Sequence, residues 1–165
     1  MKKYFLLFVL AISFLSSCTS NETTTYYLIR HSEKDRTDKT NKNPHLNFEG
    51  EKRAQKWANY FENIDLDAVY STNYNRTIQT ATPTAKSKEL EITYYNPGKM
   101  YDSIFQIETK GKTVLIVGHS NTTPVFANKI LDKEKYQNMD DNDNASLYMV
   151  TISNNLKTSS LTKFD

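Results

Sequence analysis

Two arginines and two histidines occupy positions where they could bind and attack a phosphoryl group. Arg30 and His31 are adjacent and follow the apolar stretch 26–29. Arg76 opens the stretch RTIQTA, and His119 follows the apolar stretch KTVLIVG. Guanidinium groups bind compact oxyanions through several N–H donors at once, and a neutral imidazole is a nucleophile. These residue types therefore predict a site for a compact dianion, with phosphoryl as the obvious candidate.

Two other interpretations of the histidines compete with this one. Each histidine could be an ordinary core or loop residue, or the two could ligate zinc together with Glu33 or Asp35. Neighbouring guanidinium groups would repel a divalent cation, and the usual three or four ligands are not assembled. The sequence therefore favours an anion site that uses no metal and no other cofactor.

The four residues can meet only if the fold brings their segments to one edge. Apolar stretches predict strands over 25–29, 66–71, 90–95 and 112–119, and apolar periodicity and capping residues predict helices over 46–63, 75–89, 100–110 and 121–132. Alternating strands and helices predict a three-layer α/β/α sandwich with a mainly parallel central sheet. Ligands of such sheets bind beyond the carboxyl ends of the strands, where all four residues would lie.

The C-terminal segment breaks this alternation. Residues 145–153 and 156–164 read as strands on either side of Asn154-Asn155. A two-residue asparagine turn is typical of a β-hairpin, so we expect the domain to end in one.

The first residues have the layout of an export signal. Lys2 and Lys3 precede an apolar stretch at 4–15 that is too short to span a bilayer comfortably, and LSSC ends it. This segment resembles a bacterial lipoprotein signal, in which Cys18 would become the lipidated first residue. The resemblance implies a signal peptide over 1–17 and a lipidated flexible tether over 18–24. It places the domain 25–165 on the periplasmic or surface side of the cell envelope.

The overall charge gives no reason to expect nucleic acid as a partner. The chain of 165 residues has 21 Lys and Arg against 19 Asp and Glu. Lys2 and Lys3 belong to the predicted signal, so without it the two counts are equal. Binding of an anion must then come from a local cluster of side chains.

Three short motifs, RHSEK, RTIQTA and GHSNTTP, occur in this order, and PHLNFEG follows the first. This ordered set resembles the signatures of the histidine phosphatase superfamily, also called phosphoglycerate mutase-like, over nearly all of residues 25–152. The resemblance implies that His31 attacks phosphorus and becomes transiently phosphorylated. Arg30, Arg76 and His119 would hold the phosphoryl oxygens, helped by backbone N–H groups around Asn121, without a metal.

The sequence departs from the family pattern at three places. Ser32 and Ser120 stand where glycine is more usual. Many members also carry an acidic residue between the second and third motifs, which protonates the leaving group. Asp102 is the candidate here, although it could equally cap the helix that begins at SIFQIE. Glu33 is a second candidate.

The resemblance implies a phosphohydrolase that acts outside the cytoplasm on a small phosphoester or on a phosphohistidine protein. A catalytically weak lipoprotein that only binds a phosphorylated ligand is the alternative. A phosphoglycerate mutase is less favoured, because the short span between the second and third motifs leaves little chain for a closing lid. The sequence predicts no oligomeric state.

Overall fold

The computed structural model describes residues 22–164, so the predicted signal peptide and Cys18 lie outside the described residues. In chain order the elements are β1 (Thr23–Arg30), α2 (Phe48–Phe61), β2 (Ala68–Ser71), α3 (Asn75–Ser87), β3 (Ile92–Tyr94), a 3-10 turn (Pro97–Lys99), α4 (Ser103–Thr109), β4 (Thr113–Gly118), α5 (Thr122–Leu131), β5 (Ser146–Ser153) and β6 (Leu156–Lys163). No helix within the described range is both long and apolar enough to cross a membrane.

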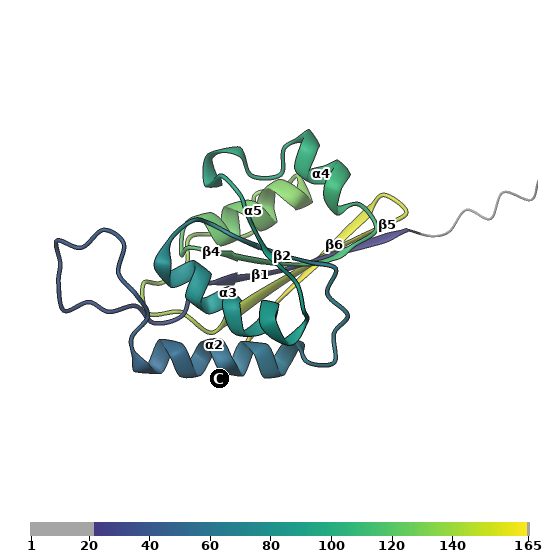
Figure 1. Ribbon diagram of the computed structural model, residues 1–165. Helices are drawn as coiled ribbons and strands as arrows, with labels where there is room; N and C mark the ends of the chain where they lie inside the picture. Colours follow the sequence, from purple (N-terminus) through teal and green to yellow (C-terminus); the bar gives the residue numbers. More distant parts are fainter. Residues whose placement is uncertain (1–21, 165) are drawn as a thin grey trace, which may run out of the picture.

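One six-stranded sheet organises the domain, in the order β3-β2-β4-β1-β5-β6. β1, β2, β3 and β4 pair in parallel, whereas β5 is antiparallel to β1 and to β6 (Figure 1). Asn154 and Asn155 both have positive φ, as the turn of a tight hairpin requires. The predicted α/β/α sandwich with a C-terminal hairpin is therefore confirmed.

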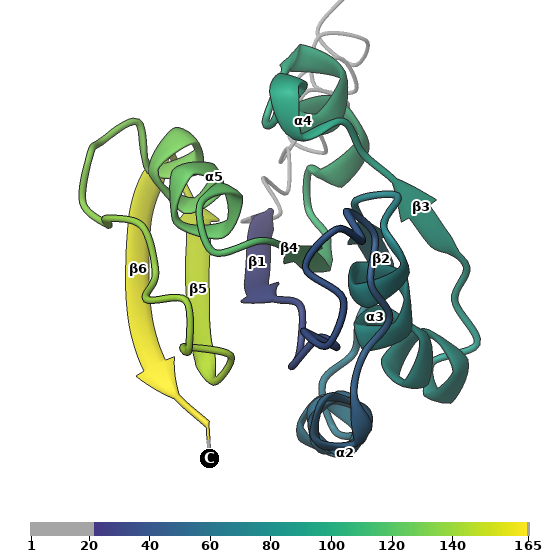
Figure 2. The ribbon, with the colours of Figure 1, turned by 90° about the vertical axis from the view of Figure 1, so that its left-hand side faces the viewer.

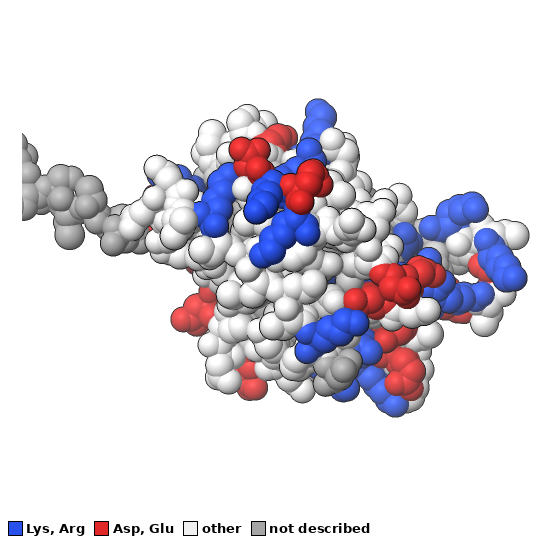
Figure 3. Space-filling view, turned by 180° about the vertical axis from the view of Figure 1, so that it is seen from behind, with Lys and Arg blue, Asp and Glu red and all other residues white. Residues whose placement is uncertain are grey.

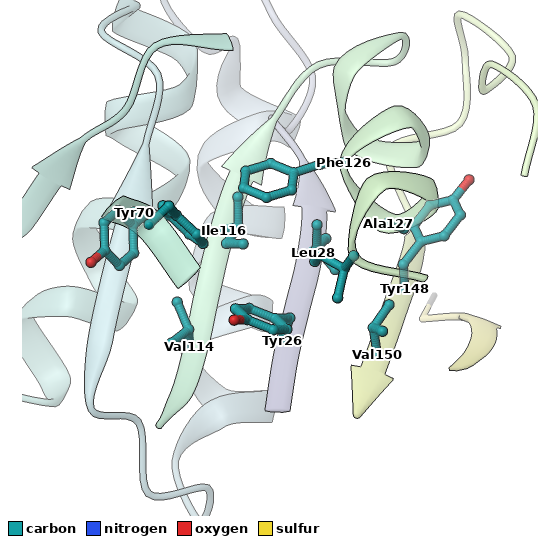
Figure 4. Close-up of a cluster of buried hydrophobic side chains, with 11 residues drawn as sticks. Tyr26, Leu28, Tyr70, Val114, Ile116, Phe126, Ala127, Tyr148 and Val150 are labelled. Carbon is teal, nitrogen blue, oxygen red and sulfur yellow. The ribbon is translucent and has the colours of Figure 1, made fainter. Parts of the chain in front are cut away.

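Helices cover both faces of the sheet. α2 and α3 lie on one face, and α4 and α5 lie on the other (Figure 1). β4 serves both layers, because Val114 and Ile116 join the core beneath Phe126 (Figure 4), while Leu115 and Val117 join the core around Trp57. A strand buried on both faces must be apolar at every position, which explains the continuous apolar stretch in the sequence.

The start of the domain differs from the expectation. β1 begins at Thr23, so Thr23 and Thr24 belong to the sheet and not to a flexible tether that runs to residue 24. Thr23 pairs with Ser153, and the Thr24 hydroxyl accepts a hydrogen bond from the Gly111 N–H at 2.8 Å. Polar threonines suggested a linker, but their β-branched side chains suit a strand that has partners on both sides.

On the face seen from behind, charged side chains of both signs lie near one another. In the view from behind, Lys and Arg are interspersed with Asp and Glu over the described surface (Figure 3). This mixture agrees with the nearly balanced charge of the sequence. Strong attraction for an anion must therefore arise inside a pocket.

Candidate active site

A pocket of about 340 Å³ opens at the carboxyl ends of β1 and β4. It is lined by Arg30, His31, Lys34, Tyr74, Arg76, Pro97, His119, Ser120, Asn121, Thr122 and Asp141. All four residues predicted to hold or attack phosphorus are in this list, together with Asn121. Figure 2 looks onto this edge of the molecule, from the side on which the loop after β1 projects.

Strand pairing sets the distance between the first and third motifs. Arg30 is the register partner of Gly118, and the His31 N–H donates to the Gly118 carbonyl at 2.9 Å. A Cβ atom at Gly118 would come within 2.9 Å of the Thr123 and Tyr95 hydroxyl oxygens. The glycine therefore allows α5 to begin directly behind His119, at the edge of the pocket.

His31 is held in one tautomer by its own loop. Its Nδ1 lies 2.7 Å from the Ser32 carbonyl oxygen. A carbonyl can only accept, so Nδ1 must carry the hydrogen, and Nε2 then keeps its lone pair. Asn144 fixes the backbone of the same residue by donating to the His31 carbonyl at 2.7 Å. His31 thus presents an oriented imidazole with one basic nitrogen.

The surroundings of His31 keep its ring neutral. Burial is the main cause that lowers its pKa to about 3, and the charges of Arg30 and Arg76 and the neighbouring His119 lower it further. The charged imidazolium is disfavoured both by loss of water and by nearby cations. His31 is therefore available as a nucleophile at any pH near neutrality.

His119 faces His31 with ring centroids 5.5 Å apart. Its Nε2 lies 2.9 Å from the Thr72 hydroxyl, and its Nδ1 lies 3.4 Å from Nη2 of Arg76. Arginine can only donate, so Nδ1 accepts and Nε2 carries the hydrogen. Burial, followed by the charges of Arg76, Arg30 and Lys34, lowers the pKa of His119 to about 4.

Arg76 carries the clearest mark of an anion site. Its guanidinium lies over the Tyr74 ring, with 4.7 Å between Cζ and the ring centroid. Nε and Nη1 are buried, and neither has a hydrogen-bond partner among the described residues. Buried guanidinium N–H groups are costly when unpaired, so a ligand that accepts from them is expected.

Arg30 is bound more tightly by the protein than the sequence suggested. Its Nη1 donates to the carbonyl oxygens of Asp140, Asp141 and Asp143 at 3.0, 2.9 and 3.2 Å, and its Nη2 donates to the Asp141 carboxylate at 3.0 Å. Only Nε remains buried and unpartnered. Arg30 therefore fixes the 140–143 loop beside the pocket as well as lining it.

Sequence reasoning missed this loop and the pocket lysine, Lys34. The signal for the loop was the orientation of the last hairpin: because β5 is antiparallel to β1, the segment before β5 returns to the edge where β1 ends. The signal for Lys34 was its place within RHSEK, three residues beyond His31.

The structure places neither predicted acid where it could protonate a leaving group. Asp102 does not line the pocket, and its carboxylate caps α4 by accepting from the Phe105 N–H at 2.9 Å. The Glu33 carboxylate is bound by Nε of Arg53 at 2.8 and 3.0 Å, and Glu33 does not line the pocket. The prediction of Asp102 as acid is thus not supported by its position.

Asp141 supplies the single carboxylate among the described residues that line the pocket. The hydrogen bond from Arg36, at 2.7 Å, is the largest of the effects that lower the Asp141 pKa to about 2, and contact with Arg30 adds to it. A general acid needs a pKa near the working pH. Asp141 is therefore a fixed negative charge and a poor proton donor.

The two serines at glycine positions of the family pattern differ in their surroundings. Ser120 lines the pocket, as expected, whereas Ser32 is fully buried and does not line it. Across residues 22–164, no three His, Cys, Asp or Glu side chains converge in the way that metal ligands do. The cationic groups of the pocket are thus the arginines and Lys34.

Comparison with known proteins finds one family model that matches part of the chain. Residues 26–96 match the model of the histidine phosphatase superfamily, branch 1. No curated protein matches the sequence.

Solved structures share the fold at low identity. The chain resembles a proposed phosphohistidine phosphatase, SixA, from Agrobacterium tumefaciens at 16% identity, with 86% of this chain and 96% of that chain covered and a TM-score of 0.58. It resembles Bacillus stearothermophilus YhfR at 14% identity, with coverage of 86% and 98% and a TM-score of 0.65. It resembles an Entamoeba histolytica phosphoserine phosphatase at 14% identity, with coverage of 84% and 96% and a TM-score of 0.63. The match over 26–96 and this shared fold agree with the resemblance of the three motifs to the histidine phosphatase superfamily.

Proposed function

We propose that this protein is a metal-independent phosphohydrolase that works through a phosphohistidine at His31. The proposal rests on two neighbouring side chains of the pocket, Arg76 and His31. Arg76 has buried N–H donors without a partner, and beside it His31 is neutral with a basic Nε2. One group binds an oxyanion and the other attacks its phosphorus.

The reaction follows from these positions in two steps. Nε2 of His31 attacks phosphorus, a P–N bond forms, and the bond to the leaving group breaks with its electron pair going to the leaving atom. Water then attacks the phosphohistidine, a P–O bond forms, and one O–H bond of the water breaks with its proton passing to solvent. The P–N electron pair returns to Nε2 as inorganic phosphate is released. Arg76 and Nε of Arg30 hold the phosphoryl oxygens, where negative charge is spread in the transition state.

The substrate class is limited because the described pocket has no carboxyl group that is protonated near neutral pH. Asp141 is the carboxylate nearest the chemistry in the described pocket, and its low pKa keeps it ionised. We therefore infer that the leaving group is one that departs with little help. The imidazole of a phosphohistidine and the phenol of an aryl phosphate are of this kind. The fold shared with the proposed SixA makes phosphohistidine the first class to test.

We also propose that a lipid on Cys18 anchors the domain outside the cytoplasm. β1 begins at Thr23, a few residues after Cys18, and ends at the pocket. Its 8 residues separate the anchor side from the pocket by roughly 25 Å at ~3.3 Å per residue. A domain held in this way would turn its pocket away from the bilayer and toward soluble substrates. Cys18→Ala should move the protein from the membrane fraction to the soluble fraction, and continued membrane association would refute the anchor.

Hydrolysis of phosphoimidazole, followed by phosphorus NMR, tests the proposed activity. The wild type should release inorganic phosphate much faster from phosphoimidazole than from glycerol phosphate, whose alkoxide leaves poorly. His31→Asn should remove turnover. The matched variant is His45→Asn, because His45 is exposed and does not line the pocket. Equal background rates for the wild type and His31→Asn, with phosphate still bound, would favour the binding-protein alternative.

A further inference from the structure

The loop after His31 holds its backbone rigidly beside the pocket. Lys34 forms a β-bridge with Leu46, and the Asn47 N–H donates to the Glu33 carbonyl at 2.9 Å. A Cβ atom at Gly50 would lie 2.0 Å from the same carbonyl oxygen, so α2 packs directly against this turn. Lys34 is therefore a lysine on a fixed backbone and not on a loose surface loop.

The side chain of Lys34 has no partner among the described residues, unlike the charged side chains near it on the loop. Glu33 binds Arg53, and Arg36 binds the Asp141 carboxylate at 2.7 Å. Lys34 makes no hydrogen bond or ion pair with any described residue, although it is half-buried and lines the same pocket as His31. Burial, and then the charges of Arg36 and Arg76, lower the pKa of Lys34. A lysine surrounded by like charge is stabilised by an added anion.

The charges around the pocket exceed what one phosphoryl group neutralises. Arg30, Lys34 and Arg76 line it, and Arg36 reaches it through Asp141. Asp141 offsets one of these positive charges, and a bound phosphoryl dianion offsets two. One positive charge remains. Among the described residues no carboxylate contacts Lys34 or Arg76, and Arg76 is already assigned to the phosphoryl group, so the remaining charge is that of Lys34.

Space for a further group lies beside Lys34. A hollow of about 200 Å³ is lined by Lys34, Arg36, Lys39, Asn41, Pro44, Asp35 and Asp38. Its three cations, Lys34, Arg36 and Lys39, outnumber its two carboxylates. Asp35 accepts from the Thr37 N–H and Asp38 from the Thr40 N–H, each at 2.8 Å. Lys34 is shared by this hollow and the phosphoryl pocket.

We propose that Lys34 is a specificity residue that binds a carboxylate of the substrate, on the part of the molecule beyond the phosphoryl group. A carboxylate fits because it supplies the single negative charge that the pocket still lacks. The inference rests on the proposed function for the position of the phosphoryl group. It adds that the substrate is a phosphorylated compound with a second anionic group.

Binding of non-hydrolysable phosphonates isolates this contact from turnover. Phenylphosphonate supplies the phosphoryl mimic alone, and 3- and 4-carboxyphenylphosphonate add one carboxylate. Calorimetry on the wild type should show at least one carboxylated ligand binding about tenfold tighter than phenylphosphonate, the scale of one charge-assisted contact. Lys34→Ala should abolish this preference while changing the dissociation constant of phenylphosphonate less than about threefold. Lys34→Arg should retain it, and Lys42→Ala, an exposed loop lysine outside the pocket, should match the wild type.

Three results would overturn the proposal. The carboxylate preference could survive in Lys34→Ala, all ligands could weaken equally in that variant, or the wild type could show no preference at all. Equal weakening would place the ammonium on the phosphoryl group instead. A preference that depends on Lys34 in a protein that fails to hydrolyse phosphoimidazole would leave this inference standing and remove the proposed hydrolase.

Discussion

Arg30 and Arg76 lie in the same pocket, but the fold treats them differently. Three backbone carbonyls and one carboxylate accept from Arg30, which leaves only Nε unpaired. Arg76 has two unpaired buried nitrogens and a single long contact, at 3.4 Å, to His119. Most N–H groups of Arg30 are therefore bound by the protein, whereas most of those of Arg76 are free to bind a ligand.

The same division separates the other polar groups of this edge. Glu33 and Asp102 are consumed by an ion pair and a helix cap, whereas Nε2 of His31 and the ammonium of Lys34 are left without partners in the described structure. Polar groups that the fold satisfies contribute stability, and those that it leaves unsatisfied are the ones expected to meet substrate.

The largest expected effects come from removing each arginine in turn. Arg76→Ala should lower kcat/KM by ~10²–10³, the usual cost of losing one donor to the transition state. Its free energy of unfolding should change by less than about 1 kcal/mol, because the one hydrogen bond lost is the long 3.4 Å contact with His119. Arg30→Ala should also lower activity, but it should cost about 3 kcal/mol of stability by stranding the 140–143 loop. Urea unfolding and steady-state kinetics measure both.

One result would refute this difference between Arg30 and Arg76. If Arg76→Ala destabilises the protein as much as Arg30→Ala does, then Arg76 has structural partners and the division between the two arginines is wrong. Arg53→Ala is a useful reference, since it breaks a partly buried ion pair with Glu33 away from the pocket.

Acid should lower the free energy of unfolding through the two buried histidines of the pocket. The pKa values of His31 and His119 are lowered to about 3 and about 4, so the unfolded chain binds protons that the folded protein does not. Their stabilising contribution is complete above the unfolded pKa of ~6.5 and is lost as the pH falls toward the folded values. We expect the free energy of unfolding to drop by ~2 kcal/mol per histidine between pH 7 and pH 5. His31→Asn should remove the part of this drop that His31 contributes. An unchanged dependence of the free energy of unfolding on pH in this variant would contradict the lowered pKa of His31.

Asp141 offers a smaller test, because its carboxylate contacts Arg30 at the wall of the pocket. Its side chain is 64% exposed and places a negative charge on Arg30 at the pocket wall. Asp141→Asn should tighten phosphate binding about fivefold at low salt, and less at physiological ionic strength. Asp65→Asn, which removes an exposed carboxylate away from the pocket, should have no effect. Weaker phosphate binding in Asp141→Asn would mean that Asp141 matters chiefly by positioning Arg30.

The smallest effect is expected at Asp102. Asp102→Ala should cost ~1 kcal/mol through loss of the α4 cap, and Asp102→Asn should cost little because asparagine caps equally well. Turnover of phosphoimidazole should stay within about twofold of the wild type in both variants. A large loss of kcat in Asp102→Asn, with stability preserved, would restore the acid role that its position argues against.

The sequence predicted the sheet and the meeting of the motifs because each depends on local patterns. The apolar stretch of β4 and the residues that follow β1, β2 and β4 are short-range signals, and parallel strands then bring Arg30, His31, Arg76 and His119 together. The asparagine turn of the last hairpin was equally local.

What could not be predicted depends on contacts between distant segments. Arg30 and the 140–143 loop meet only because β5 pairs with β1, and the sequence does not state which strand β5 joins. The partners of Glu33 and Asp102 decide whether either carboxyl is free, and those partners are matters of packing. The role of Lys34 depends on the same packing, since a lysine in a polar stretch usually lies in water.

The most direct test of the account is the identity of the phosphorylated atom. The wild type should be mixed with radiolabelled phosphoimidazole, quenched in alkali within milliseconds, and digested for mass spectrometry. The account predicts an alkali-stable, acid-labile phosphoryl group on the peptide that contains His31, absent from His31→Asn and present in His45→Asn. Label on another residue, or full turnover by His31→Asn, would contradict it.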